Sequence, residues 1–253
     1  GDIGLTSYPT PQRGPIVHPA STLPAALLWD MDGTLVDTEA YWMAAEYELV
    51  ESFGGVWNHE HAMAVVGRAL TGTAAYVIEH GRVPLGVDEV VGALLASVGR
   101  RLREHVPWRP GALELLAEAR AAEVPSALVT MSYRSLTDLL LEAMPTELLA
   151  VVIAGDDVTH GKPHPEPYLA AATRLGAAPE ACIAVEDSLF GAQSATAAGV
   201  PTIVVPNVKP VAAIAGSVQL PTLAGLRVAD LVAATAGLRR ARLRGPSPAL
   251  DRP

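Results

Sequence analysis

The chain has 253 residues, of which 50% are hydrophobic, and its formal net charge is -9. The length suffices for one large domain or for a core with an insert, and the negative charge argues against nucleic acid or an anionic membrane as a partner. The single cysteine, Cys182, excludes an intrachain disulfide, and no apolar run approaches the roughly 20 residues of a membrane span. These features indicate a cytoplasmic location; we also expect a monomer whose partner is a small molecule.

The first motif follows a proline-rich leader. Residues 1–24 contain no apolar signal-peptide centre and are expected to form an extended arm. The apolar run from Ala26 to Trp29 then predicts a buried strand of a parallel sheet. Asp30 and Asp32 follow this strand directly, at the position where open α/β sheets bind ligands. The alternative is an ordinary turn, since Asp and Gly are common turn residues.

A purely helical pattern follows from residue 38 to residue 106. The first helix has Asp37 or Thr38 as its N-cap and ends at Gly54-Gly55. Further helices are predicted near residues 59–66, 73–80 and 88–105. Since no strong strand signal interrupts them, we predict an all-α insert over residues 38–106.

Strands and helices alternate from residue 107 onward. Strands are predicted over residues 126–130, 151–154, 182–185 and 202–205, and helices over residues 111–122, 136–142, 166–175, 189–198 and 230–238. This alternation predicts a doubly wound, Rossmann-like parallel α/β core formed by residues 25–37 and 107–238. The Arg- and Pro-rich residues 239–253 are expected to be a loose tail.

Polar residues come at or just beyond the carboxyl ends of the predicted strands: Asp30 and Asp32, then Thr130 and Ser132 on either side of Met131, then Lys162, and finally Glu186 and Asp187. Because parallel strands end at one edge of the sheet, these residues should converge. Two carboxylates about 4 Å apart repel by roughly 4 kcal/mol at an effective dielectric near 20, so that clustered acids need a cation. Ligands that are all oxygen atoms favour Mg²⁺.

Lys162 is one of only two lysines in the chain, the other being Lys209. A compact ammonium beside the acids can offset their charge and hold a phosphate group. The alternative is a surface lysine in a turn formed by Pro163 and Pro165.

These motifs resemble those of the haloacid dehalogenase superfamily, in the subgroup with a helical cap inserted after the first motif. Within it the chain is similar to the β-phosphoglucomutase-like and phosphoglycolate-phosphatase-like branch. The matching stretches run from Asp30 to Thr38, from Gly161 to Glu166 and from Val185 to Gly191, with Thr130 as the second motif. The resemblance implies a Mg²⁺-dependent phosphoric monoester hydrolase whose cap is residues 38–106.

The resemblance also implies a role for each matching residue. Asp30 would be the nucleophile that forms an aspartyl-phosphate, and Asp32 the general acid and then the general base. Thr130, backbone N–H groups near Met131 and the Lys162 ammonium would bind the phosphoryl oxygens. The Mg²⁺ ligands would be Asp30, the backbone carbonyl of Asp32, Asp187 and, directly or through water, Glu186.

The substrate is predicted only by class, as a sugar or polyol phosphate. Arg68, Ser132 and Arg134 are candidates for contacting it, although both arginines could equally be surface residues. A phosphomutase is one alternative, but Trp42 occupies the position of the histidine of the family's mutases, and residues 38–106 contain no lysine. A catalytically silent phosphometabolite-binding protein is another.

Overall fold

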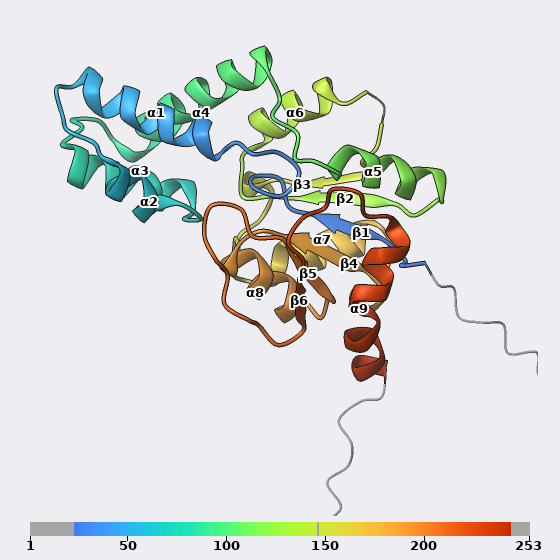
Figure 1. The fold of residues 1–253 in the computed structure, drawn as a ribbon. Coiled ribbons are helices and arrows are strands. Elements are labelled where there is room, and N and C mark those ends of the chain that lie inside the picture. Colours follow the sequence, from blue (N-terminus) through green and yellow to red (C-terminus); the bar gives the residue numbers. More distant parts are fainter. Residues whose placement is uncertain (1–22, 146, 244–253) are drawn as a thin grey trace, which may run out of the picture.

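A parallel six-stranded sheet forms the centre of the computed structural model, which describes residues 23–145 and 147–243 (Figure 1). β1 (Leu27–Trp29) lies between β2 (Ser126–Val129) and β4 (Ile183–Glu186). The order is β3-β2-β1-β4-β5-β6, and every pair is parallel. The chain order therefore reverses between β1 and β4, which is the switch point where doubly wound sheets bind ligands. The predicted fold class is confirmed.

Except for the last strand, the other strands and the helices that follow the insert lie close to their predicted positions. The strands are β3 (Val151–Ile153), β5 (Thr202–Val204) and β6 (Ser217–Gln219). The helices are α5 (Ala112–Ala121), α6 (Arg134–Ala143), α7 (Glu166–Arg174), α8 (Leu189–Ala197) and α9 (Val228–Leu243), with short 3₁₀ turns at Gly155–Asp157 and Pro179–Ala181.

Both faces of the central strands β2, β1 and β4 are buried, which explains why these strands are mostly apolar. Leu27 and Trp29 of β1 point into one apolar cluster, together with residues of α5 and α9. Leu28 points into a second cluster, together with residues of α7 and α8. Because side chains alternate along a strand, β1 contributes to both clusters and is held firmly in the centre. The residues at its carboxyl end are therefore fixed in position.

Four helices lie between β1 and α5: α1 (Glu39–Ser52), α2 (His59–Val65), α3 (Leu70–Gly81) and α4 (Val87–Glu104). Figure 1 shows them gathered at one end of the molecule, away from α9. The segments that enter and leave this helical part run side by side, since Asp37 N donates to Pro107 O (2.8 Å) and Arg109 N to Leu35 O (2.9 Å). The helical content is as predicted; the division into core and cap domains stays a prediction.

The structure corrects the sequence analysis at three places. β6 was not predicted, because Ser217–Gln219 is short and only half-apolar at the edge of the sheet. The loose tail predicted from residue 239 is wrong at its start, since α9 continues to Leu243. Thr38 is the N-cap residue of α1, but its side chain does not cap the helix. The predicted arm lies outside the described residues up to residue 22, as does the tail after residue 243.

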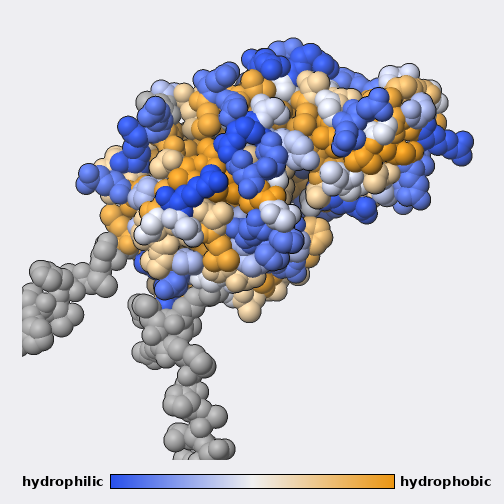
Figure 2. All heavy atoms as spheres, turned by 180° about the vertical axis from the view of Figure 1, so that it is seen from behind, coloured by the Kyte–Doolittle hydropathy of each residue, from blue (hydrophilic) through white to orange (hydrophobic). Residues whose placement is uncertain are grey.

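The surface mixes polar and apolar side chains. Figure 2 shows apolar patches bordered by hydrophilic groups on the face opposite to that of Figure 1. Among the described helices, none combines the length and hydropathy that a membrane span requires.

Candidate active site

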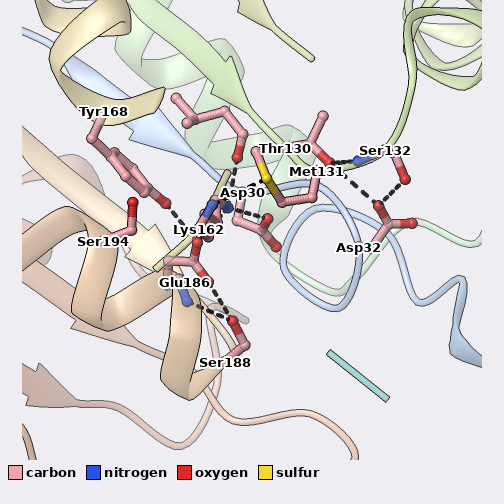
Figure 3. A network of polar contacts seen from close by, with 12 residues as sticks. Asp30, Asp32, Thr130, Met131, Ser132, Lys162, Tyr168, Glu186, Ser188 and Ser194 are labelled. Carbon is pink, nitrogen blue, oxygen red and sulfur yellow. Dashed lines mark hydrogen bonds and ion pairs between the residues drawn. The ribbon is translucent and has the colours of Figure 1, made fainter. Parts of the chain in front are cut away.

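Lys162 joins two of the predicted acids at the switch point (Figure 3). Its Nζ donates to Asp30 Oδ1 (2.7 Å), to Glu186 Oε1 (2.5 Å) and to the backbone O of Val129 (2.8 Å). All three ammonium protons therefore have acceptors, as a buried charge requires. Burial works against the charged form, but the carboxylates of Asp30 and Glu186 outweigh it and raise the pKa of Lys162. The lysine is a structural partner of the acids and not a surface residue.

Glu186 is enclosed on all sides and has no exposed surface. Besides Lys162, the hydroxyl of Tyr168 donates to its Oε1 (2.6 Å) and Ser188 Oγ to its Oε2 (3.1 Å). Gly191 lies against this carboxylate so closely that a Cβ there would meet its atoms at 2.0 Å. The glycine of the fourth motif is thus required by the close approach of the α8 backbone.

Asp32 accepts hydrogen bonds from four side chains that come from both halves of the chain. At Oδ1 the donors are Thr38 Oγ1 (2.5 Å) and Trp42 Nε1 (3.3 Å). At Oδ2 they are Ser132 Oγ (2.6 Å) and, at a longer distance, Thr130 Oγ1 (3.4 Å). Thr38 fails to cap α1 because its hydroxyl is used here. The second aspartate of the motif is therefore held in one orientation beside Asp30.

Asp30 is buried, and only one of its two carboxylate oxygens accepts a hydrogen bond from a described residue. Oδ1 accepts from Lys162, whereas the buried Oδ2 has no hydrogen-bond partner among the described residues. Burial, followed by the charge of Glu186, raises the pKa of Asp30 to about 7 although Lys162 opposes the shift. Burial and the charges of Asp30 and Glu186 also raise the pKa of Asp187 well above its ordinary value.

These acids fit a hard divalent cation. Ligand oxygens of Asp30, Glu186 and Asp187 all lie within 4.8 Å of one another. Lys162 supplies a single positive charge against three carboxylates, and an unpartnered buried oxygen is costly unless an ion binds it. Since Glu186 already accepts three hydrogen bonds, Asp30 and Asp187 are the acids best placed to hold the ion directly. Oxygen ligands suit Mg²⁺.

A pocket of about 360 Å³ opens over these residues and is lined by both the core and the helical insert. Seven of the predicted site residues line it together with Arg68 of the insert: Asp30, Asp32, Thr130, Met131, Ser132, Lys162 and Asp187. Glu186 lies beneath it. Arg134 does not line it, because its guanidinium pairs with Asp157 and its backbone N–H donates to Asp156 (2.9 Å). The structure therefore brings together every predicted site residue except Arg134.

The pocket also contains polar residues that the sequence analysis missed. Glu39 and Glu46 of α1 line it, as does Lys209 from the segment between β5 and β6. Burial is the main cause that raises the pKa of Glu46 to about 8 and that of Glu39 to about 7. Lys209 Nζ donates to Val66 O (3.3 Å) and so connects the core to the insert. Glu46 follows Trp42 by one helical turn of α1, and this spacing could have placed it on the same face of the helix. No feature of the sequence marked Tyr168, because an aromatic residue in a helix such as α7 is typical of a core.

The comparison with known proteins settles the family. The sequence profile of the haloacid dehalogenase-like hydrolases matches residues 27–205. The chain belongs to this family. The family prediction, drawn from four short motifs, is thereby confirmed.

Two relatives show what kinds of protein the chain is similar to. It is 30% identical over 180 residues to the fructose-1-phosphate phosphatase YqaB of Escherichia coli, which covers 71% of this chain and 95% of that protein. It is 28% identical over 187 residues to the bifunctional riboflavin kinase/FMN phosphatase of Arabidopsis thaliana, covering 73% of this chain but 49% of that protein. The chain thus spans about half the length of this plant relative.

Among solved structures, a mutant of CbbY from Rhodobacter sphaeroides in complex with xylulose 1,5-bisphosphate superimposes with a TM-score of 0.74. The two chains are 28% identical, and the match covers 83% of this chain and 99% of that one. Together with the relatives named as phosphatases, this match confirms the predicted enzyme class, a phosphoric monoester hydrolase.

Proposed function

We propose that this hydrolase is a Mg²⁺-dependent phosphatase that acts on a small sugar or polyol phosphate through an aspartyl-phosphate on Asp30. The observation that carries the proposal is the contrast between the two aspartates of the first motif. No described residue donates to the second carboxylate oxygen of Asp30, whereas both oxygens of Asp32 are oriented by donors. The first suits a nucleophile and the second suits a residue that transfers a proton.

In the first step, an Asp30 oxygen attacks phosphorus and the bond from phosphorus to the substrate's ester oxygen breaks. Asp32 gives its proton to that oxygen, so that the product leaves as a neutral alcohol. Thr130, the backbone near Met131 and Lys162 are proposed to bind the phosphoryl oxygens. Mg²⁺ would be held by Asp30, by the backbone carbonyl of Asp32, by Asp187 and, directly or through water, by Glu186. Its charge would reduce the repulsion between the anionic nucleophile and the phosphate.

In the second step, water attacks the phosphorus of the aspartyl-phosphate. The Asp32 carboxylate takes a proton from the water, the bond between phosphorus and Asp30 breaks, and inorganic phosphate is released. Asp32 is thereby protonated again and Asp30 is again a carboxylate. Helix α1, which supplies Glu39 and Trp42 to the pocket wall, and the segment between α2 and α3, which supplies Arg68, would limit the access of bulk water.

The polar wall of the pocket supports a hydroxylated substrate. Glu39 and Glu46 offer hydrogen-bonding carboxyl groups, while Arg68 and Lys209 are the cations that line the side formed by the insert and the β5–β6 segment. The guanidinium of Arg68 stacks over Tyr76 at 5.0 Å, and its Nε donates to Ala64 O (2.9 Å). A second anionic group on the substrate, such as that of the bisphosphate bound to CbbY, would find these two cations within the same pocket.

Ser132 is proposed to act through Asp32, whose Oδ2 it contacts. A substrate role for Arg134 is not proposed, because its guanidinium is paired with Asp157 outside the pocket. That the enzyme is a cytoplasmic monomer, acting on a free metabolite without nucleic acid or membrane, is part of the proposal.

The test is a phosphate-release screen over sugar phosphates, sugar bisphosphates, polyol phosphates and phosphoglycolate, with and without Mg²⁺. We expect Mg²⁺-dependent release from at least one sugar or polyol phosphate, and none from the Asp30→Asn variant. Release by that variant at the parent rate would refute the mechanism. Binding of these esters without turnover would favour the silent binding protein instead.

A further inference from the structure

A second group of metal-ligating side chains lies outside the pocket, on the loop that carries Lys162. His160, His164 and Glu166 place one ligand atom each within 4.8 Å of the others, and none of the three lines the pocket. We propose that these three side chains bind a divalent transition metal of the zinc type, at a site separate from the Mg²⁺ centre.

The distances are already near those of a metal site. His160 Nδ1 lies 3.0 Å from Glu166 Oε2, and His164 Nδ1 lies 4.0 Å from the same oxygen. Ligand atoms about 2.0–2.1 Å from a tetrahedral zinc ion are roughly 3.3 Å apart. The two imidazoles, whose ring centroids are 4.7 Å apart, therefore need only a small rotation to share one ion with the carboxylate.

The backbone of the loop fixes two of the ligands. Glu166 accepts from the N–H groups of Thr159 (2.8 Å) and His160 (2.9 Å), which closes the loop on itself. The carbonyl of His164 accepts from Ser194 Oγ of α8 (2.5 Å). A metal would replace the hydrogen bond between His160 Nδ1 and Glu166 Oε2 (3.0 Å) and the bond that His164 Nδ1 now accepts from the backbone N–H of Glu166 (3.2 Å). That N–H lies in the first turn of α7, where helix N–H groups have no helical partner and can bind water.

Ligand type separates the two sites. The Mg²⁺ centre offers only oxygen atoms, whereas two imidazoles and one carboxylate are the set that zinc, nickel and copper prefer. The side chains of His160 and His164 are 63% and 52% exposed, so that an ion could enter from solvent and keep a water ligand. Since Lys162 lies between the two histidines in the sequence, a bound metal would brace the loop that holds the ammonium against Asp30.

The test compares zinc binding by the parent chain with that of His160→Asn and His164→Asn, by calorimetry in excess Mg²⁺. His59→Asn is the matched control, because His59 is exposed and lies on α2, apart from the cluster. Zinc that binds at the acidic centre or elsewhere is common to all four proteins, so that differences among them report the cluster alone. Cobalt(II) absorption in the visible range gives a second measurement that responds to nitrogen ligands.

We expect one zinc ion per chain whose affinity falls by roughly tenfold or more in each cluster variant and stays unchanged in the control; even outer-shell changes typically cost 10–100-fold. The cobalt band should weaken in the same two variants. Circular dichroism verifies that the variants fold. Equal zinc affinity in the parent and both cluster variants, or a cobalt spectrum that neither substitution alters, would overturn the proposal.

Discussion

Glu46 offers a test of the pocket that does not depend on knowing the substrate. The residue is 3% exposed, and Trp57 Nε1 donates to its Oε2 (3.3 Å). Burial raises the pKa of Glu46 from 4.5 to about 8, and the charge of Glu39 adds to this shift. The hydrogen bond from Trp57 opposes the shift, and no basic side chain among the described residues contributes to it. The folded chain therefore holds a proton on Glu46 at neutral pH that the unfolded chain has released.

The sign of the effect follows from proton linkage. Between the unfolded pKa near 4.5 and the folded pKa near 8, the folded state binds more protons than the unfolded state. Glu46 therefore makes the free energy of unfolding fall as pH rises through this window. One pKa unit corresponds to about 1.36 kcal/mol, so that two pH units within the window give at most about 2.7 kcal/mol. Allowing for water in the open pocket, we expect about 2 kcal/mol.

The perturbation is Glu46→Gln, which keeps the size and the acceptor for Trp57 but cannot ionise. The free energy of unfolding is measured by urea unfolding with tryptophan fluorescence, in Mg²⁺ and at several values between about pH 5 and pH 7. As pH rises, the free energy of unfolding of the variant should increase by about 2 kcal/mol relative to that of the parent. The control is Glu51→Gln, which removes the same charge from an exposed position close to Glu46 on α1. Parallel pH profiles for the parent and Glu46→Gln would refute the reasoning.

The remaining predictions concern the reaction. Asp30→Asn should lower kcat by several orders of magnitude without unfolding the chain, because an amide cannot attack phosphorus; circular dichroism and phosphate release measure this, and activity within tenfold of the parent contradicts it. EDTA should abolish turnover, Mg²⁺ should restore it, and Asp187→Ala should stay inactive even in excess Mg²⁺. Trp42→Phe removes one donor to Asp32 and should lower kcat about fivefold with little change in KM, since one hydrogen bond is worth about 1 kcal/mol; an unchanged kcat would show that the contact is passive. β-Glucose 1-phosphate, if accepted, should give inorganic phosphate and not glucose 6-phosphate in ³¹P NMR, and the opposite result would favour the mutase.

The centre of the fold and most of the site could be predicted from the sequence because one rule governs both. Short apolar runs predict buried parallel strands, and the carboxyl ends of such strands share one edge. Asp30, Thr130 and Glu186 come directly at the ends of three neighbouring strands, so that their meeting required no knowledge of side-chain conformation. Lys162 follows from its rarity and from the charge that surrounds it.

The residues that the sequence did not reveal are those whose role depends on packing between distant segments. Lys209 looked like an unrelated second lysine, and only the structure shows that the segment after β5 brings it to the insert. Trp42 was noted as the residue at the position of the mutases' histidine, yet its indole N–H donates to Asp32. Both contacts join the core to the insert, and no periodicity within a single helix or strand can report such a contact.

Glu46 shows why packing between distant segments matters for function. A carboxyl group in a helix usually faces solvent, and only its enclosure by α1, Trp57 and the pocket turns it into a group that titrates near neutral pH. The pKa of Asp30 is raised in the same way, but Lys162 opposes that shift and the proposed cation would oppose it further. Among the described residues no cation opposes the raised pKa of Glu46, so that its protonated carboxyl group can donate as well as accept a hydrogen bond. The core therefore supplies the charged groups that suit phosphoryl transfer, and the insert supplies a neutral polar group that suits a hydroxyl of the substrate.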